Sequence, residues 1–273
     1  LAGFAETYAA ALASRTFDAS AWADFFDDLA LELPDGSVLE GRFVLVDDEG
    51  QLLAPSSGDE GKPLVFFGPS AGDTAPPTVQ PPEAVRARLA FTSSAIPWVD
   101  AQRRRRRGRD WLEAQNLVRE YHTDSVLDLV GDVMRTTDDD ESCAECLQFA
   151  FDLWRTARRD VGAETLARAR LPLPTVGGWI PPREAYFGVG WEGDSADTDR
   201  LLERLLSRAA ELSPPLAKVA AGILRPPKEV VAPTSDVDEM RRFLETLGAN
   251  PGLVPRYFPA RSFRLSGNRV GTP

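Results

Sequence analysis

The chain has 273 residues, which is enough for one large domain or two modest ones with sizeable apolar cores. Hydrophobic residues make up 43% of it and charged residues 27%, a composition that excludes a disordered chain. Because 42 acidic residues outnumber 31 basic ones, the formal charge of −11 opposes non-specific binding to nucleic acid or anionic membrane, and any such contact needs a local basic patch.

No apolar run approaches the roughly 18 residues that a membrane span requires, and no charged and apolar leader opens the sequence. We therefore expect a cytoplasmic chain without a membrane partner. The sequence begins at Leu1 and closes on SGNRVGTP without a final element. From this we expect it to be a piece of a longer protein.

The first 80 residues predict a helix pair followed by a small β meander. Residues 3–17 and 18–33 repeat apolar side chains every three or four positions, and Asp18 or Ser20 is suited to cap the second helix. Residues 41–55 then read as strand, Asp-Asp-Glu-Gly turn and strand, and residues 62–68 supply a third strand. A Pro-rich stretch over residues 70–82 ends the ladder, so we expect a first domain over 1–80 and a second over 81–273.

The second region is predicted to be mainly helical. Amphipathic stretches cover residues 109–121, 123–137, 143–159 and 162–169; Thr123 or Asp124 is suited to cap the second of these, and Asp140 or Ser142 to open the third. A β-hairpin near 171–188 turns at Gly177-Gly178, with Trp179, Ile180, Tyr186 and Phe187 on its buried face. Helices are expected again over 195–213, 214–227 and 234–248. The fold class is α+β, dominated by helices, with two small antiparallel β elements near 42–68 and 171–188.

Most motifs that could carry chemistry have a plainer structural interpretation. Gly188, Gly190 and Gly193 have the spacing of a dinucleotide loop, but the acids Glu192 and Asp194 stand at the end where the phosphates would bind. Cys143 and Cys146 have only His122 as a further soft ligand, so a zinc site would hold at most three ligands. Their helical setting and nearby acids favour two small apolar residues over a redox pair.

His122 and the acidic run over 138–141 are likewise expected to serve helix ends. A Ser-His-Asp or Cys-His arrangement would have to use His122, the single histidine, which lies at a helix boundary. The run of acids lacks the alternating ligand positions and central glycine of a calcium loop, and acids are favoured at a helix start by its dipole. We predict no catalytic, cofactor or metal site in this segment.

The arginine run is the one local feature that opposes the global charge. Its members are Arg103, Arg104, Arg105, Arg106, Arg107 and Arg109. Five adjacent arginines around a helix would point in all directions, so some must meet solvent, acids elsewhere in the chain, or an anionic partner. We expect acids within the same protein first. Nucleic acid is the alternative, because such a run can contact phosphates, although no aromatic residues interleave for base stacking.

Three stretches also resemble a known family. The pairing of RFVLVDDEGQLLAP with PLVFFGP, the stretch LPLPTVGGWIPPREAYFGVGW, and RRFLETLGANPGLVPR are similar to the region downstream of the ATPase domain in large bacterial sacsin-like and NO VEIN-like proteins. The resemblance implies a non-catalytic interaction or scaffold segment of a chaperone-like or regulatory ATPase, in some bacterial settings associated with defence. Its partners would be other domains of the same protein or separate proteins. The nucleotide-binding motifs of that ATPase domain do not occur in this sequence.

Overall fold

The computed structural model describes residues 18–33, 35–56, 63–68, 79–156, 162–188, 191, 208, 211, 214–230, 232 and 236–250. The helix expected over residues 3–17 lies outside these, and so does nearly all of the one expected over 195–213. In the described part, helices dominate an α+β fold with three sheets of two strands each. The fold class predicted from the sequence is therefore confirmed.

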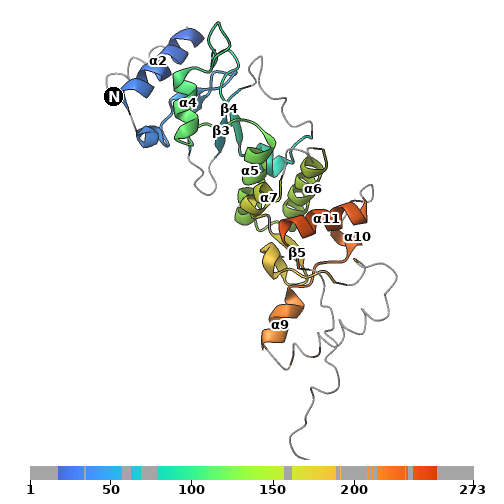
Figure 1. Ribbon diagram of the computed structural model, residues 1–273. Coiled ribbons are helices and arrows are strands. Elements are labelled where there is room, and N and C mark those ends of the chain that lie inside the picture. The colour runs from blue at the N-terminus through green and yellow to red at the C-terminus, as the bar shows by residue number, and fades with distance from the viewer. Residues whose placement is uncertain are drawn as a thin grey trace, which may run out of the picture.

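The elements follow one another from the N-terminal α2 to α11, and Figure 1 shows α2 and α4 at one end, α5, α6 and α7 in the middle and α9 at the other end. The helices are α2 (Ala19–Glu32), η1 (Gly36–Leu39), α3 (Glu83–Arg86), α4 (Arg107–Ala114), α5 (Thr123–Thr136), α6 (Asp140–Thr156), α7 (Ala163–Ala169), η2 (Pro182–Glu184), α9 (Pro214–Ala221), α10 (Pro227–Val230) and α11 (Val237–Leu247). The strands are β1 (Leu45–Val46), β2 (Leu52–Leu53), β3 (Leu64–Phe66), β4 (Leu89–Phe91), β5 (Leu173–Thr175) and β6 (Gly178–Ile180).

Both predicted hairpins are present. β1 and β2 pair antiparallel around a turn in which the Asp47 carboxylate accepts the amide of Gln51 at 2.7 Å and Gly50 takes a φ of +78°. β5 and β6 also pair antiparallel. Gly178 has a φ of +118° there, and the Thr175 hydroxyl donates to its carbonyl at 2.7 Å. The glycines are thus explained by tight turns.

The third predicted strand has a different partner from the one expected. β3 does not extend the β1–β2 meander; it pairs in parallel with β4, Leu64 opposite Leu89 and Phe66 opposite Phe91. On its other side, the Phe67 amide donates to the Arg119 carbonyl at 3.0 Å. The physical reason is burial, since all three β3 residues are buried and a strand covered on both faces is stabilised by neighbours on both edges.

Alternation along β3 separates two hydrophobic cores. The N-terminal core gathers Trp22, Ala23, Phe26, Leu39, Leu45, Val46, Val65, Phe67, Ile96, Trp98, Trp111, Leu112, Leu117 and Val118. The C-terminal core is larger and is built mainly from α5, α6, α7 and α11, together with Leu64 and Phe66 of β3. Packing in the N-terminal core crosses residue 80, where the sequence predicts a domain boundary, and the division into 1–80 and 81–273 stays a prediction.

Helix ends follow the expected chemistry with two corrections. Asp18 caps α2, and Asp236 and Gly248 bound α11, as predicted. The cap of α5 is His122 rather than Thr123 or Asp124, because its ring nitrogen reaches the Ser125 amide. Asp139, one position before the predicted candidates, accepts the Ser142 amide at 2.8 Å at the start of α6.

The amphipathic stretch over 109–121 is only half helical. α4 ends at Ala114, and Asn116 takes a left-handed φ of +56°, which asparagine tolerates better than most residues. Leu117 and Val118 are still buried, but from the segment that runs beside β3. Leu117 and Val118 are therefore apolar because they pack beside the sheet. The helical spacing of apolar residues predicted a helix that is longer than α4.

Close packing of α5 on α7 depends on Gly131. A β-carbon at this position would overlap the Ala169 carbonyl oxygen at the end of α7. The Arg135 guanidinium donates to that same carbonyl at 3.0 Å. Glycine thus lets the two helices approach closely, which sets the position of the chain where it leaves α7.

Candidate functional site

The arginine run lies in a turn that leads into α4. The sequence suggested a helix over the whole run, but only Arg107 and Arg109 are helical. The Asp100 carboxylate accepts hydrogen bonds from the amides of Gln102 at 2.8 Å and Arg104 at 2.9 Å. The backbones of Arg105 and Val99 form an antiparallel β-bridge. Arg103 has a left-handed φ of +60°. The turn sends successive side chains in different directions before the helix begins.

Carboxylates of the same chain neutralise four of the six arginines. Arg104 pairs with Asp100 at 2.8 Å, and Arg105 pairs with Glu113 at 2.7 Å and with Glu120 at 2.8 Å. Arg106 and Arg109 are the other two, and they are more buried than Arg104 and Arg105. The acidic partners expected from the composition are therefore present within the chain.

Arg106 and Arg109 tie α4 to the rest of the N-terminal core. Arg106 pairs with Asp27 at 2.8 Å and with Asp24, both on α2. Burial acts to lower the pKa of Arg106, but the hydrogen bonds that it donates to Asp27 and Asp24 outweigh this effect and raise that pKa. Arg109 is fully buried, pairs with Glu120 at 2.7 Å and lies over the Phe67 ring at 5.1 Å.

Arg103 and Arg107 are exposed, and neither pairs with a carboxylate among the residues that the structure describes. Of the six arginines predicted as partner contacts, these two alone are exposed and have no carboxylate partner among the described residues. Contact of the run with an anion or a partner stays a prediction.

The two cysteines are buried in α6, as the apolar interpretation requires. Both are unpaired thiols on the face that packs into the C-terminal core. Burial, followed by the nearby carboxylates of Asp140, Asp139 and Asp138, raises the pKa of Cys143. Burial raises the pKa of Cys146 to about 12. These thiols lack the thiolate character of redox or metal-binding cysteines.

His122 is engaged as a helix cap. Its Nδ1 accepts the Ser125 amide at 3.2 Å and lies 2.7 Å from the Ser125 hydroxyl. Because a backbone amide can only donate, Nδ1 is the acceptor and the ring proton sits on Nε2. The local geometry of the cap accounts for this Ser-His contact.

The acidic run is also used at the start of α6. Asp139 caps the helix, and Asp140 accepts two hydrogen bonds from Arg225, at 2.8 and 3.0 Å, and one from the Trp179 indole at 2.7 Å. These contacts, Arg225 first, hold the pKa of Asp140 below its ordinary value. Within the described ranges, no group of three or more histidine, cysteine or acidic residues is arranged to hold a metal ion.

In the glycine and aromatic stretch after β6, the described aromatic side chains pack into the C-terminal core. Residues 189 and 190 lie outside the described residues. Phe187 and Trp191 are buried against each other, with ring centroids 5.5 Å apart, and the Trp191 indole donates to the Arg225 carbonyl at 2.9 Å. Both rings belong to the C-terminal core.

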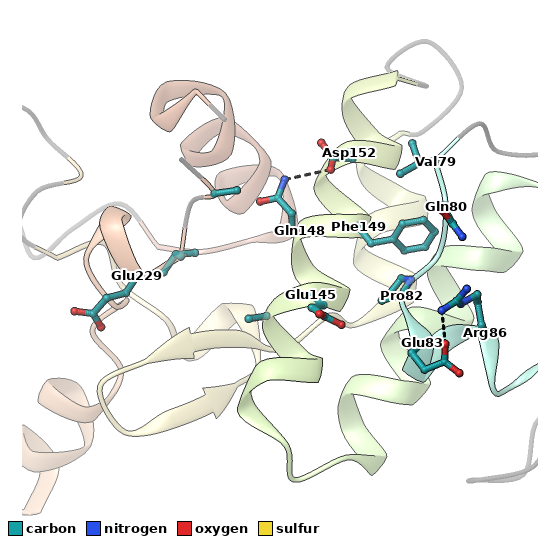
Figure 2. A pocket seen from close by; sticks show the side chains of 13 residues that line it. Val79, Gln80, Pro82, Glu83, Arg86, Glu145, Gln148, Phe149, Asp152 and Glu229 are labelled. Carbon is teal, nitrogen blue, oxygen red and sulfur yellow. Dashed lines mark hydrogen bonds and ion pairs between the residues drawn. The ribbon is translucent and has the colours of Figure 1, made fainter. Parts of the chain in front are cut away.

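An open hollow with a volume of about 650 Å³ lies between α3, α6 and α10. We call it the acidic groove; its lining residues are Val79, Gln80, Pro82, Glu83, Arg86, Ala144, Glu145, Gln148, Phe149, Asp152, Glu229, Val230 and Ala232. In Figure 2, Glu229 approaches from the α10 side and Glu83 and Arg86 from the α3 side, with α6 between them.

Four carboxylates face one guanidinium around this groove. Arg86 pairs with Glu83 on its own helix, so its charge is locally compensated. Asp152 accepts from Gln148 at 3.2 Å and pairs with Arg155 at 3.0 Å. Glu145 and Glu229 are exposed and form no salt bridge among the described residues, but the Arg225 guanidinium interacts with Glu229 at longer range. The groove therefore carries an uncompensated negative charge.

Apolar surface forms the rest of the groove. Phe149 is only 4% exposed and belongs to the C-terminal core, while Val79 and Val230 are half-buried and pack against that core. A surface that combines a hydrophobic floor with a charged rim has the anatomy of a protein contact site. The sequence interpretation did not single out these residues, although Glu145, Gln148, Phe149 and Asp152 recur at helical spacing on one face of α6.

No family model matches the chain, and neither the curated proteins nor the solved structures include one with significant similarity to it. Among the described helices, none has the length and apolar character needed to cross a bilayer. The resemblance to the sacsin-like and NO VEIN-like family stays a prediction.

Proposed function

We propose that this chain is a non-catalytic interaction segment whose acidic groove binds a protein segment rich in lysine or arginine. One observation carries the proposal: Glu145 and Glu229, which form no described salt bridge, line the same hollow as the apolar side chains of Phe149 and Val230. Carboxylates on the rim attract the cations and orient them. The apolar floor then accommodates the methylene stems and apolar neighbours of the bound segment.

In this proposal the partner is another domain of the same longer protein or a separate protein. The sequence resemblance would make the larger assembly a chaperone-like or regulatory ATPase, with this segment as a scaffold that carries no nucleotide site of its own. The net charge of −11 supports a cationic partner over a polyanionic one, because it adds a long-range attraction to the local one.

Nucleic-acid binding by the arginine run remains the alternative function. Arg104, Arg105, Arg106 and Arg109 already pair with carboxylates, and a phosphate would have to displace those acids. The exposed pair Arg103 and Arg107 could neutralise about two phosphates, which gives a weak and strongly salt-dependent contact. The geometry therefore favours the acidic groove.

The test is binding of a 15-residue amphipathic Lys/Leu peptide to the whole chain, measured by calorimetry at physiological salt. Glu145→Gln combined with Glu229→Gln should weaken binding by roughly tenfold, at about 0.5–1 kcal/mol per lost charge contact. The matched control is Glu49→Gln combined with Glu164→Gln, which removes the same charge from exposed sites outside the groove.

Equal loss of affinity in both double variants would mean that net charge alone attracts the peptide and that the groove is not the site. A short single-stranded oligonucleotide serves as the competing probe. Submicromolar binding to it, abolished by Arg103→Gln and Arg107→Gln together, would favour the nucleic-acid alternative instead.

A further inference from the structure

A second cavity, distinct from the acidic groove, lies where the ends of α5, α7 and α11 meet the segment after β6. Its volume is about 760 Å³, which falls in the range of pockets that hold small organic ligands. Its polar lining consists of Arg135, Arg170, Arg183, Asp138 and Thr137. Because Arg135 pairs with Asp132, Arg170 and Arg183 against Asp138 leave an excess of one positive charge in a chain whose net charge is −11.

Arg170 and Arg183 have no carboxylate partner among the described residues. Both are exposed, and both line the cavity from opposite segments, one after α7 and the other in η2. Arginines without an acid partner in an acidic chain keep their donor groups available. Guanidinium groups are suited to bind phosphate or carboxylate groups, and both of these arginines line the same cavity.

Arg135 holds the backbone that presents Arg170. It pairs with Asp132, and its Nη1 donates to the carbonyls of Ala169 at 3.0 Å and Arg170 at 3.3 Å. Arg170 itself has a φ of +52° and a ψ of 42°, a left-handed conformation that a residue with a β-carbon rarely adopts. Arg170 is the C-cap of α7, and a left-handed residue is a common way for a helix to end.

Trp179 gives the cavity a flat apolar wall. Its indole nitrogen donates to Asp140 at 2.7 Å, and the Arg225 guanidinium lies over its ring, 6.0 Å from the centroid. These contacts fix the ring before any ligand enters. Leu166, Pro182 and Leu247 add further apolar surface around the same space.

We propose that this cavity binds a small organic anion, with a phosphate or carboxylate group on a flat apolar body. Arg170 and Arg183 bind the anionic group, and the body lies along Trp179. This site is independent of the acidic groove, since the two hollows share no lining residue and have opposite charge.

The test is a titration of the whole chain with phenyl phosphate and with benzoate, followed by the indole N–H signals in proton–nitrogen NMR spectra. The Trp179 signal is assigned with Trp179→Phe. Inorganic phosphate and benzyl alcohol are the matched probes that carry the anion or the flat body alone. We expect one of the two aromatic anions to bind at least tenfold more tightly than either matched probe and to shift the Trp179 signal; which one binds distinguishes phosphate from carboxylate recognition.

Arg170→Gly combined with Arg183→Gln should reduce that affinity at least tenfold, and glycine suits the left-handed backbone at residue 170. Arg42→Gln combined with Arg107→Gln removes two exposed arginines elsewhere and should leave binding unchanged. The proposal is overturned if neither aromatic anion moves the Trp179 signal at about 10 mM, a concentration above the dissociation constants of weak specific complexes. It is also overturned if the Arg170 and Arg183 variant keeps its secondary structure by circular dichroism and binds as tightly as the original chain.

Discussion

The N-terminal and C-terminal cores are stabilised in different ways. Around the N-terminal core, the arginine run connects α4 to α2 through Arg106 and to the strand-like segment at Glu120 through Arg109. The C-terminal core is built mainly from apolar helix faces, with Phe151 and Phe243 in ring contact and the partly buried Trp154 packed against both. Where arginines serve the core they are no longer available to partners. Where apolar packing is sufficient, charged side chains remain to line hollows on the surface.

β3 joins the two regions because its side chains alternate between them. Each side chain of this strand therefore tests one core, Phe66 the C-terminal one and Val65 the N-terminal one. The predictions below use this difference, in order of decreasing expected effect.

Phe66→Ala should have the largest effect. The ring is fully buried, and its centroid lies 5.9 Å from that of Phe91 and 5.5 Å from that of Tyr121. Its removal should lower the free energy of unfolding by about 3–5 kcal/mol, from lost burial and the cavity left behind. Urea unfolding measures this loss of stability. Phe43→Ala is the control, because Phe43 is 64% exposed and its substitution should change stability by less than about 0.5 kcal/mol. Similar values for the two variants would contradict the placement of β3 between the cores.

Gly131→Ala should lower the free energy of unfolding by about 1–3 kcal/mol. The added methyl group overlaps the Ala169 carbonyl, so α5 and α7 must separate. Gly162→Ala is the control, because a β-carbon there meets nothing within 4 Å. Thermal unfolding of both variants compares them, and an equally stable Gly131→Ala protein would show that the helices do not pack as closely as described.

Acid should remove the contribution of Asp140. Its pKa is held below the ordinary value of about 3.9, so its contacts with Arg225 and Trp179 stabilise the fold above that value and are lost as the pH falls through the lower, folded-state pKa. The stability difference between the original chain and Asp140→Asn should be present at neutral pH and vanish in acid. Thermal unfolding across this range measures it, and a difference that stays constant with pH would contradict the contacts.

The cysteines give the smallest energetic effect but a clear kinetic one. With the pKa of Cys146 at about 12, its thiolate population near neutral pH is roughly a thousandfold below that of an ordinary thiol with a pKa of about 8.5. Neither thiol should react with a disulfide reagent within minutes in the folded chain, and both should react at once in concentrated guanidinium chloride. Rapid labelling of folded protein would contradict their burial in α6.

Periodicity and turn chemistry predicted some of the local elements. The hairpin at Gly177-Gly178, the Asp18 cap and the burial of Cys143 all follow from rules that involve a few neighbouring residues. The partner of β3 could not be predicted in the same way, because parallel pairing with β4 depends on where a Pro-rich connection returns the chain.

Side-chain partners far apart in the sequence were equally out of reach. The acidic composition predicts that arginines find carboxylates, but it does not indicate that Arg106 selects Asp27, 79 positions away. The acidic groove brings together α3, α6 and α10, and only the α6 part leaves a periodic trace in the sequence. The site residues proposed from the arginine run were a local signal, whereas both hollows arise from tertiary packing.

The most direct test of how the N-terminal core uses the arginine run compares two adjacent members of the run. Arg106→Gln should lower the free energy of unfolding by about 1.5–3 kcal/mol, because it removes charged hydrogen bonds to Asp27 and Asp24. Arg107→Gln removes an exposed arginine that has no described carboxylate partner, and should change stability by less than about 0.5 kcal/mol. Urea unfolding of these two variants distinguishes a structural role of the run from a role in binding. Equal stability of both would contradict the account and return the arginine run to the role of a contact surface.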